Sequence, residues 1–452
     1  MNTDLLNKYN IPGPRYTSYP TVPYWENQST AEQWKSHVRK SFLTNNDKQG
    51  ISVYIHLPYC ESLCTYCGCN TRITVNHKVE EPYIKALLKE WTMYLNMFEE
   101  KPRIQEIHLG GGTPTFFSPA NLIKLMEGIS STSYFSPDAE FSFEGHPNNT
   151  TTHHLESLYN AGFRRVSFGI QDFDANVQKA IHRIQSFEQV RSVTELARKT
   201  GYKSVNFDLI YGLPFQTLNT INDTINKVIT LKPDRIAFYS YAHVPWIKPA
   251  QRGYSETDLP APEIKRKLYE TGRKLLIEAG YIETGMDHFA LPEDSLSLAL
   301  QNKTLYRNFM GYTTSKTKTL IGLGVSAIGD TWTAFSQNVK SVEGYLQKIA
   351  EGKLPLFRGH ILTEEDLILR KHILQIICTG ETKWNLQNEQ CAFLYDSLEL
   401  LHPMETDGLL VLDPQKLNVT ETGKIFIRNI CMAFDARLIR NQPQTQLFSQ
   451  TV

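Results

Sequence analysis

Short β-branched apolar runs alternate with longer amphipathic stretches between residues 51 and 279. The runs predict strands at 51–57, 104–109, 140–145, 164–170, 204–210 and 235–241. The amphipathic stretches predict helices at about 79–98, 119–130, 151–160, 187–200, 217–230 and 261–279. Because strands that alternate with helices form βαβ units, the fold class is α/β with a parallel sheet. This periodicity alone fits a doubly wound sheet or an incomplete barrel.

Polar and small residues follow the predicted strands at their carboxyl ends. They are His56, Cys60, 110–113, Glu144, Gln171, Asp208 and 242–243. Sites in α/β proteins form where parallel strands end. Contributions from all six strands favour a barrel mouth over the single crevice of an open sheet. The alternative is that these residues are polar only because loops are polar.

The flanking regions have a different pattern. Residues 11–25 (IPGPRYTSYPTVPYW) predict an extended, packed arm, with a short helix at 31–43. Beyond residue 290 we expect a closing segment at 320–331, helices over 363–401, a hairpin at 408–419 and a helix at 421–437. The chain therefore divides into an N-terminal arm (1–45), a barrel with its closing segment (46–335) and a mainly helical C-terminal domain (336–452).

Composition narrows the class of protein. The 452 residues are 41% hydrophobic and 21% charged, which is typical of a globular protein. Lys plus Arg equals Asp plus Glu at 47 each, so a large nucleic-acid footprint is not expected. The N-terminus lacks the pattern of a secretory signal, and no run approaches 18 apolar residues. We expect a cytoplasmic protein without a membrane span.

Four of the seven cysteines lie within ten positions, in CESLCTYCGC at 60–69. A cysteine cluster in a reduced compartment indicates metal binding. Three thiolates from Cys60, Cys64 and Cys67 suit a [4Fe-4S] cluster that leaves one iron open for a ligand. The C-x3-C-x2-C spacing after a first strand is typical of the radical S-adenosylmethionine (SAM) superfamily. Structural zinc is the alternative, disfavoured because a second knuckle is missing.

The other cysteines and strand-end residues are open to two interpretations each. Cys69 either supports the cluster or is a bystander, and the remaining three are expected in the core: Cys378, Cys391 and Cys431. The glycines at 110–112 allow close backbone approach to a ligand, or form only a tight turn. Glu144 suits the ammonium or ribose of SAM. A second polar ligand would suit Gln171, Arg183 and Asp208. The alternative for Arg183 and Asp208 is an ordinary ion pair.

At these residues the chain resembles the oxygen-independent coproporphyrinogen III oxidase family over nearly its whole length. The shared motifs include PGPRYTSYPT at 12–21, YIHLPYCESLCTYCGCN at 54–70, HLGGGTPT at 108–115 and FGIQDF at 168–173. They continue with NFDLIYGLPFQT at 206–217, RNFMGYTT at 307–314, GLGVSAIGD at 322–330 and RNICMAFD at 428–435. The arm and RNICMAFD make the resemblance specific to this family.

The resemblance implies a fold and a reaction. The fold would be an incomplete parallel (β/α)6 barrel with the arm over its mouth. Two propionates of coproporphyrinogen III would become vinyl groups by oxidative decarboxylation, started by a 5′-deoxyadenosyl radical. Two SAM molecules are implied. The cluster-bound SAM would contact Tyr54, Gly111, Glu144 and Ile328. The second would contact Tyr66, Gly112, Thr113, Gln171, Arg183, Asp208 and Ala242.

The resemblance also implies partners and leaves alternatives. The tetracarboxylate substrate needs cations, of which Arg15 is a candidate. An electron-donor protein of the flavodoxin or ferredoxin type and a monomeric state are expected. The family pattern has Gln after Phe309 and Asp two residues beyond Glu144, whereas this chain has Met310 and His146. A related haem chaperone is the alternative function, disfavoured by the PRYTSYPT arm and by Cys69.

Overall fold

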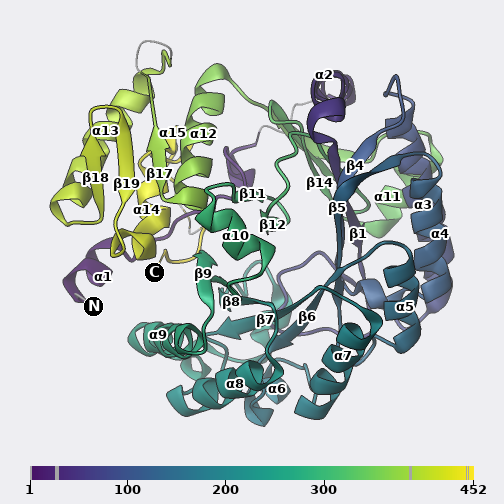
Figure 1. Ribbon diagram of the computed structural model, residues 1–452, viewed down its shortest axis with the longest axis horizontal. Coiled ribbons are helices and arrows are strands. Elements are labelled where there is room, and N and C mark those ends of the chain that lie inside the picture. Colours follow the sequence, from purple (N-terminus) through teal and green to yellow (C-terminus); the bar gives the residue numbers. More distant parts are fainter. Residues whose placement is uncertain (1–2, 26–29, 386–388, 444, 446, 452) are drawn as a thin grey trace.

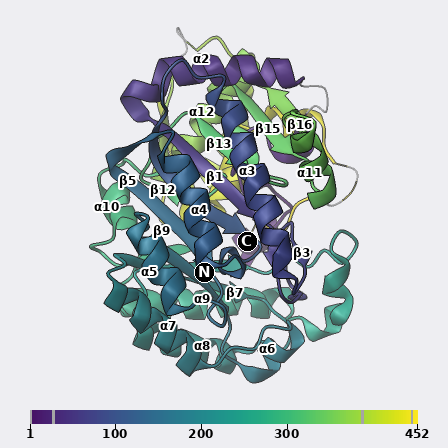
Figure 2. The same ribbon diagram turned by 90° about the vertical axis from the view of Figure 1, so that its right-hand side faces the viewer.

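The computed structural model describes residues 3–25, 30–385, 389–443, 445 and 447–451. Figures 1 and 2 show an open barrel of strands with helices on its outside, and a smaller helical part that carries the C-terminus. The N-terminal helix α1 (Thr3–Tyr9) lies beside this smaller part in Figure 1.

Six parallel neighbours form the barrel, in the order of their appearance in the chain. They are β1 (Ile51–Leu57), β4 (Arg103–Gly111), β5 (Tyr134–Gly145), β6 (Arg165–Gln171), β7 (Ser204–Tyr211) and β8 (Arg235–Ser240). All six predicted strands are confirmed, although β5 begins six residues before its predicted start at 140. The parallel (β/α)6 arrangement expected from the sequence is therefore present.

Helices cover the outer face of this sheet (Figure 1). They are α3 (Glu80–Leu95), α4 (Pro119–Ser130), α5 (Thr152–Asn160), α6 (Ala175–Ala180), α7 (Phe187–Thr200), α8 (Leu218–Leu231) and α9 (Pro262–Glu278). The short helix α6 was not predicted.

Helix α7 shows why these segments fold as they do. Ser186 closes a capping box at its start, a contact typically worth about 1 kcal/mol. Val190, Val193 and Ala197 recur at helical spacing and are all buried. Gly201 ends the helix with φ 109°, a left-handed conformation that suits glycine. Local capping and one apolar face together determine the helix and the side that it buries.

The sheet continues beyond the six strands at both ends. Next to β1 it adds β13 (Leu320–Leu323), β14 (Ile328–Asp330), β15 (Ala334–Asn338) and β16 (Leu356–Ile361). Next to β8 it adds β10 (His288–Ala290) and β9 (Ile282–Gly285). Only β13 runs parallel to its barrel neighbour, so the predicted closing segment joins the sheet beside β1. The boundary expected at residue 335, between the barrel and the C-terminal domain, falls inside β15. We propose instead a division after Ile361, which keeps all strands of the sheet in one domain.

Several smaller elements connect the barrel. They are β2 (Tyr59–Cys60), β3 (Arg72–Ile73), α10 (Ser295–Gln301), β11 (Tyr306–Asn308), β12 (Gly311–Thr313) and α11 (Val342–Ala350). The β11–β12 hairpin lies between the barrel and the smaller part in Figure 1.

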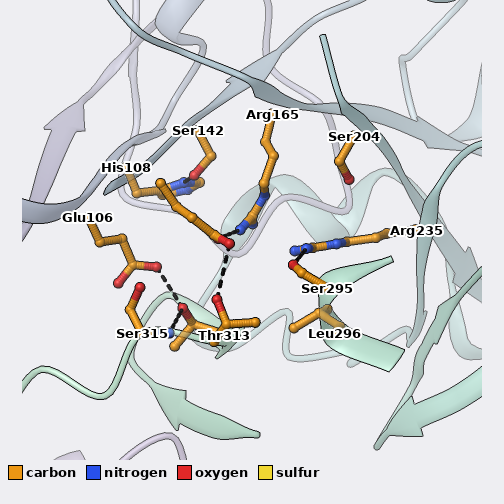
Figure 3. A network of polar contacts seen from close by, with 12 residues as sticks. Glu106, His108, Ser142, Arg165, Ser204, Arg235, Ser295, Leu296, Thr313 and Ser315 are labelled. Carbon is orange, nitrogen blue, oxygen red and sulfur yellow. Dashed lines mark hydrogen bonds and ion pairs between the residues drawn. The ribbon is translucent and has the colours of Figure 1, made fainter. Parts of the chain in front are cut away.

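A polar network fixes the segment that follows this hairpin to the barrel interior (Figure 3). The Thr313 hydroxyl donates to Glu106 at 2.8 Å, and the Thr314 hydroxyl donates to Glu140 at 3.0 Å. Arg165 pairs with Glu140 at 2.5 Å. Burial raises the pKa of Glu106. Burial also acts on Glu140, but Arg165, Arg235 and the Thr314 hydroxyl together outweigh it and hold the pKa of Glu140 below its usual value. The hairpin is therefore anchored through two hydrogen-bonded carboxylates, of which Glu106 is buried and Glu140 half-buried.

The C-terminal part is mainly helical, as expected. It contains α12 (Glu364–Thr379), β17 (Glu381–Lys383), α13 (Ala392–Thr406), β18 (Leu410–Asp413), β19 (Lys416–Val419), α14 (Ile427–Met432) and α15 (Ala436–Arg440). The predicted hairpin at 408–419 is confirmed. The single helix predicted at 421–437 is wrong, because a 3-10 turn precedes α14 and Asp435 caps a separate helix, α15. Residues 386–388 of the predicted 363–401 helical region lie outside the described residues.

The N-terminal arm packs between the two parts. The Tyr16 hydroxyl donates to buried Asp435 at 3.0 Å. Trp25 stacks on Phe335 of β15 with ring centroids 4.9 Å apart. The predicted helix at 31–43 extends to α2 (Ala31–Gln49) and stops at Gly50, whose φ is 69°. Residues 1–2 and 26–29 of the expected arm lie outside the described residues.

Candidate active site

A cavity of about 680 Å³ lies at the carboxyl ends of the barrel strands. Its wall includes the three cysteines and most of the other predicted site residues. These are Cys60, Cys64, Tyr66, Cys67, Gly111, Gly112, Thr113, Glu144, Gln171, Arg183 and Asp208. Side chains from distant parts of the sequence thus meet because parallel strands end at one edge of the barrel.

The cysteine loop leaves β1 and passes through the short strand β2. Cys60, Cys64 and Cys67 are free and partly exposed, and Cys69 is exposed. The Cys67 N–H donates to the Cys64 carbonyl at 3.2 Å, which forms a turn between two of the proposed ligands. Burial raises the pKa of Cys60 to about 11, and a hydrogen bond with Cys69 lowers the pKa of Cys67 to about 6. Cys69 thus contacts one cysteine of the triad.

The donor set fits an iron–sulfur cluster better than a single ion. Within the described ranges, no three His, Cys, Asp or Glu side chains surround one metal-ion position. An iron–sulfur cluster holds several irons, so its cysteine ligands need not converge on one point. The Arg183 guanidinium lies 3.8 Å from the Cys64 sulfur and places positive charge beside the cysteine loop. Three thiols on one cavity wall, with a neighbouring cation, therefore suit such a cluster.

The glycine run after β4 is bonded directly to the cysteine loop. The Gly112 N–H donates to the Leu57 carbonyl at 2.8 Å, and the Thr113 N–H donates to the Tyr59 carbonyl at 3.0 Å. A Cβ on Gly112 would lie 2.6 Å from the carbonyl group of Pro58. The glycine run is therefore hydrogen-bonded, backbone to backbone, to the segment that carries the cysteine loop. Gly111 and Gly112 also line the cavity.

Glu144 extends from the end of β5 into the cavity. Its side chain is 41% exposed, and it accepts hydrogen bonds from His108 at 3.4 Å and from the Gly111 N–H at 3.2 Å. Burial at the cavity wall raises its pKa, but these two donors outweigh burial and hold the pKa below its usual value. A carboxylate held ionised in this way suits a cationic or hydroxyl-bearing ligand.

Arg183, in the loop after α6, and Asp208, on β7, face the same cavity. Arg183 donates to the Gly169 carbonyl at 2.7 Å, and its Nε is buried without a partner. Asp208 accepts from Ser167 at 2.9 Å and from Asn206 at 2.8 Å. Burial and the nearby Glu144 raise the pKa of Asp208 to about 6. Arg183 and Asp208 do not form the ion pair that the sequence left open. Both side chains line the cavity, and the unpartnered Nε of Arg183 can donate to a ligand.

Comparison with known proteins identifies the family. The radical SAM superfamily model matches residues 54–228. The oxygen-independent coproporphyrinogen III oxidase of Helicobacter pylori strain J99 is 40% identical over 442 residues, which cover 96% of each chain. The protein of the same name from Escherichia coli K12 is 37% identical over 455 residues, covering 99% of this chain and 98% of that one. The chain belongs to the oxygen-independent coproporphyrinogen III oxidase family.

A solved structure supports this family assignment. It is that of coproporphyrinogen III oxidase (HemN) from Escherichia coli, described as a radical SAM enzyme. The two folds match with a TM-score of 0.90 and 36% sequence identity, over 97% of this chain and 99% of that chain. The radical SAM barrel with its helical C-terminal part is therefore the fold of this family member.

Three predicted site residues lie outside the wall of the cavity. Tyr54 stacks on His108 with ring centroids 6.0 Å apart and lies 3.0 Å from the His56 ring nitrogen. Ala242 accepts a hydrogen bond from Gln251 through its carbonyl at 3.2 Å. Ile328 packs against an aromatic cluster around Trp25. Their roles toward SAM remain predictions from the family resemblance.

Two residues of the cavity region were not singled out from the sequence. His108 holds Glu144 and also contacts Ser142 at 2.8 Å, and Tyr239 lines the cavity from β8. His108 lies on β4 two residues before Gly110, and Tyr239 lies on β8 three residues before Ala242. The alternation of side chains along a strand was the signal that could have indicated them.

The two departures from the family pattern have different surroundings. His146 lines the cavity, and burial together with Arg183 lowers its pKa to about 3. It is therefore neutral where the family pattern has an acid. The backbone of Met310 donates to Asn308 in the β11–β12 turn, at 2.8 Å. Met310 is not part of the cavity wall.

Two further expectations from the sequence concern the burial of the other three cysteines and the presence of a membrane-spanning helix. Cys378, Cys391 and Cys431 are buried, as expected for core residues. Across the part of the chain that the structure describes, no helix is sufficiently long and apolar to cross a bilayer.

Proposed function

We propose that this protein converts coproporphyrinogen III to protoporphyrinogen IX in anaerobic haem biosynthesis. Two propionate side chains become vinyl groups by oxidative decarboxylation. Each conversion breaks one carbon–carbon bond to release CO2 and removes one hydrogen atom and one electron from the side chain. The observation that carries this proposal is 37% and 40% sequence identity to enzymes of this name over nearly the whole chain, together with three free cysteines on the wall of one barrel-mouth cavity.

The cofactors of the radical SAM family are a [4Fe-4S] cluster and SAM, and the chain offers residues for both. Cys60, Cys64 and Cys67 would hold the cluster. When bound, these cofactors supply a 5′-deoxyadenosyl radical that removes hydrogen from unactivated carbon. Glu144, ionised and exposed to the cavity, would bind the ammonium of SAM. The glycine run would place its backbone against the same ligand.

A second SAM molecule is the finer part of the proposal. It would lie against Arg183, Asp208 and Gln171, on the wall formed by β6 and β7. The guanidinium would bind the carboxylate of this molecule. Asp208 would accept hydrogen bonds from its amino or hydroxyl groups. The buried, unpartnered Nε of Arg183 supports a ligand here, because buried donors are normally bonded.

The cellular setting is proposed from chemistry and composition. An electron-donor protein of the flavodoxin or ferredoxin type would reduce the cluster. We infer a monomer in the cytoplasm, where cysteine ligands stay reduced.

An anaerobic turnover assay tests the function. Protein reconstituted with iron and sulfide should hold about four irons per chain and form protoporphyrinogen IX from coproporphyrinogen III, SAM and a reductant. Tight haem binding without any product would instead favour the chaperone function. Stoichiometric zinc without iron would refute both.

A further inference from the structure

An excess of positive charge lies where β7 and β8 end, beside the N-terminal arm. Arg15 pairs with Asp287 at 2.5 Å, from Nη1 to Oδ2. Lys265 donates to the backbone carbonyl of Tyr241 at 2.7 Å. Among the described residues, Lys265 has no carboxylate within ion-pair distance. Burial and, second to it, the neighbouring charge of Arg15 lower the pKa of Lys265 to about 8.

Arg307 adds a third cation on the β11–β12 hairpin. Its side chain is buried, with the residue only 8% exposed, and its guanidinium carbon lies 4.4 Å from the ring centroid of Tyr312. Two of its nitrogens, Nε and Nη1, are buried without a hydrogen-bond partner. Buried guanidinium donors are normally satisfied, and a buried cation without a partner is costly. These donors therefore point to an anionic ligand.

A continuous set of aromatic contacts connects Arg307 with the cofactor cavity. The Tyr312 ring lies 5.1 Å from the ring of His288, between centroids. The His288 Nε2 lies 3.4 Å from the hydroxyl of Tyr239, which lines the cavity. The charges of both Arg15 and Arg307 act on that hydroxyl. The cationic group and the cavity are thus neighbours that share Tyr239.

The fold holds Arg15 and Lys265 in place, and Asp287 neutralises only one of these two charges. Arg428 donates to the carbonyls of Gly13 and Pro14, which fixes the arm directly before Arg15. The aliphatic stem of Lys265 packs over Gly212, where a Cβ would come within 2.6 Å of its Cε. Backbone carbonyls and packing therefore position the arm and Lys265, and Asp287 is the carboxylate that pairs with Arg15.

We propose that Arg15, Lys265 and Arg307 form a carboxylate-binding subsite for the propionate groups of the tetrapyrrole. The inference rests on the proposed function, which supplies a substrate with four carboxylates. The chain has zero formal net charge, so the field that attracts such a substrate must be local. This group of cations, with Asp287 as its paired carboxylate, provides that field beside the cofactor cavity.

Equilibrium dialysis of the reconstituted holoenzyme against coproporphyrin III, the stable oxidised tetracarboxylate, tests the subsite. Lys265→Met keeps the aliphatic stem and removes the charge, and Arg307→Gln removes the second cation. Each should weaken binding by about ten- to a hundredfold, the usual effect of losing a hydrogen bond to a charged group. Lys274→Met is the matched control, because Lys274 lies on the same helix with its side chain 75% exposed.

Kinetics separate a binding role from a structural one. The KM for coproporphyrinogen III should rise in both variants, while iron content and the KM for SAM stay at wild-type values. Arg307→Lys should recover part of the lost affinity. Unchanged affinity in the well-folded Lys265→Met and Arg307→Gln proteins would overturn the subsite. Absence of product from the wild-type protein would instead overturn the proposed function, so the two failures are distinct.

Discussion

Replacing Gly112 by alanine is expected to displace the cysteine loop. The new Cβ would lie 2.6 Å from both the carbon and the oxygen of the Pro58 carbonyl, and 2.9 Å from the Tyr59 carbonyl oxygen. These are backbone atoms, so no side chain can rotate away. Pro58 lies two residues before Cys60, and the Gly112 N–H bonds to Leu57 on the same segment. The substitution therefore moves the backbone that positions the first cysteine.

The size of the effect follows from the cost of overpacking. Adding a methyl group to a closely packed site typically costs about 1–3 kcal/mol. At about 1.4 kcal/mol per tenfold change, this displaces the equilibrium away from the native loop by about five- to 150-fold. Gly68 provides the matched control within the same loop, because a Cβ there meets no atom within 4 Å.

The assay is iron and sulfide content after anaerobic reconstitution, with the thermal unfolding midpoint measured alongside. Gly112→Ala should bind substantially less iron than the wild-type protein, and Gly68→Ala should bind the same amount. Equal iron content in all three proteins would refute the view that the glycine run determines the position of the cysteine loop. A loss in Gly68→Ala as large as in Gly112→Ala would refute it as well.

Three further predictions concern the cluster, a buried acid and the arm. Cys64→Ala should abolish both iron binding and turnover, measured by iron analysis and product formation, and retained activity would exclude Cys64 as a ligand. Glu90 is fully buried, and burial raises its pKa to about 7, so the folded state retains a proton that the unfolded state releases above its ordinary value of 4.5. The contribution of Glu90 to the unfolding free energy should therefore fall by about 3 kcal/mol as pH rises from 4.5 to 7, and Glu90→Gln should remove this part of the pH dependence in urea titrations; an unchanged slope would contradict the assignment. Deleting residues 1–24 removes Arg15 and should lower turnover far more than iron content, whereas wild-type kinetics would show that the arm does not shape the substrate site.

The barrel was predictable because its strands are long and regularly spaced. The run at 51–57 coincides with β1 to the residue, since apolar β-branched residues fill a buried parallel strand. The added strands at the sheet ends were harder, because β10 and β14 have three residues each and carry little periodicity. The break at Asp435 was missed because the apolar pattern continues across it, while the capping carboxylate acts only locally.

The candidate site was predictable where spacing or glycine content is distinctive. The cysteines and the run at 110–112 stood out in this way. His108 and Tyr239 did not, because a single inward-facing polar residue on a strand has no spacing of its own. Arg307 could not be selected among 47 Lys and Arg residues, since its significance depends on the unpaired nitrogens that only the folded chain reveals.

The most direct test of the proposed function is to count carbon dioxide released by the reconstituted protein. Coproporphyrinogen III labelled in its propionate carboxyl carbons, incubated anaerobically with SAM and a reductant, should yield two labelled CO2 molecules for each protoporphyrinogen IX formed. Release should require SAM and should be absent in Cys64→Ala. No labelled CO2 from an iron-replete, reduced wild-type protein would contradict the assignment of this chain as a coproporphyrinogen III decarboxylating enzyme.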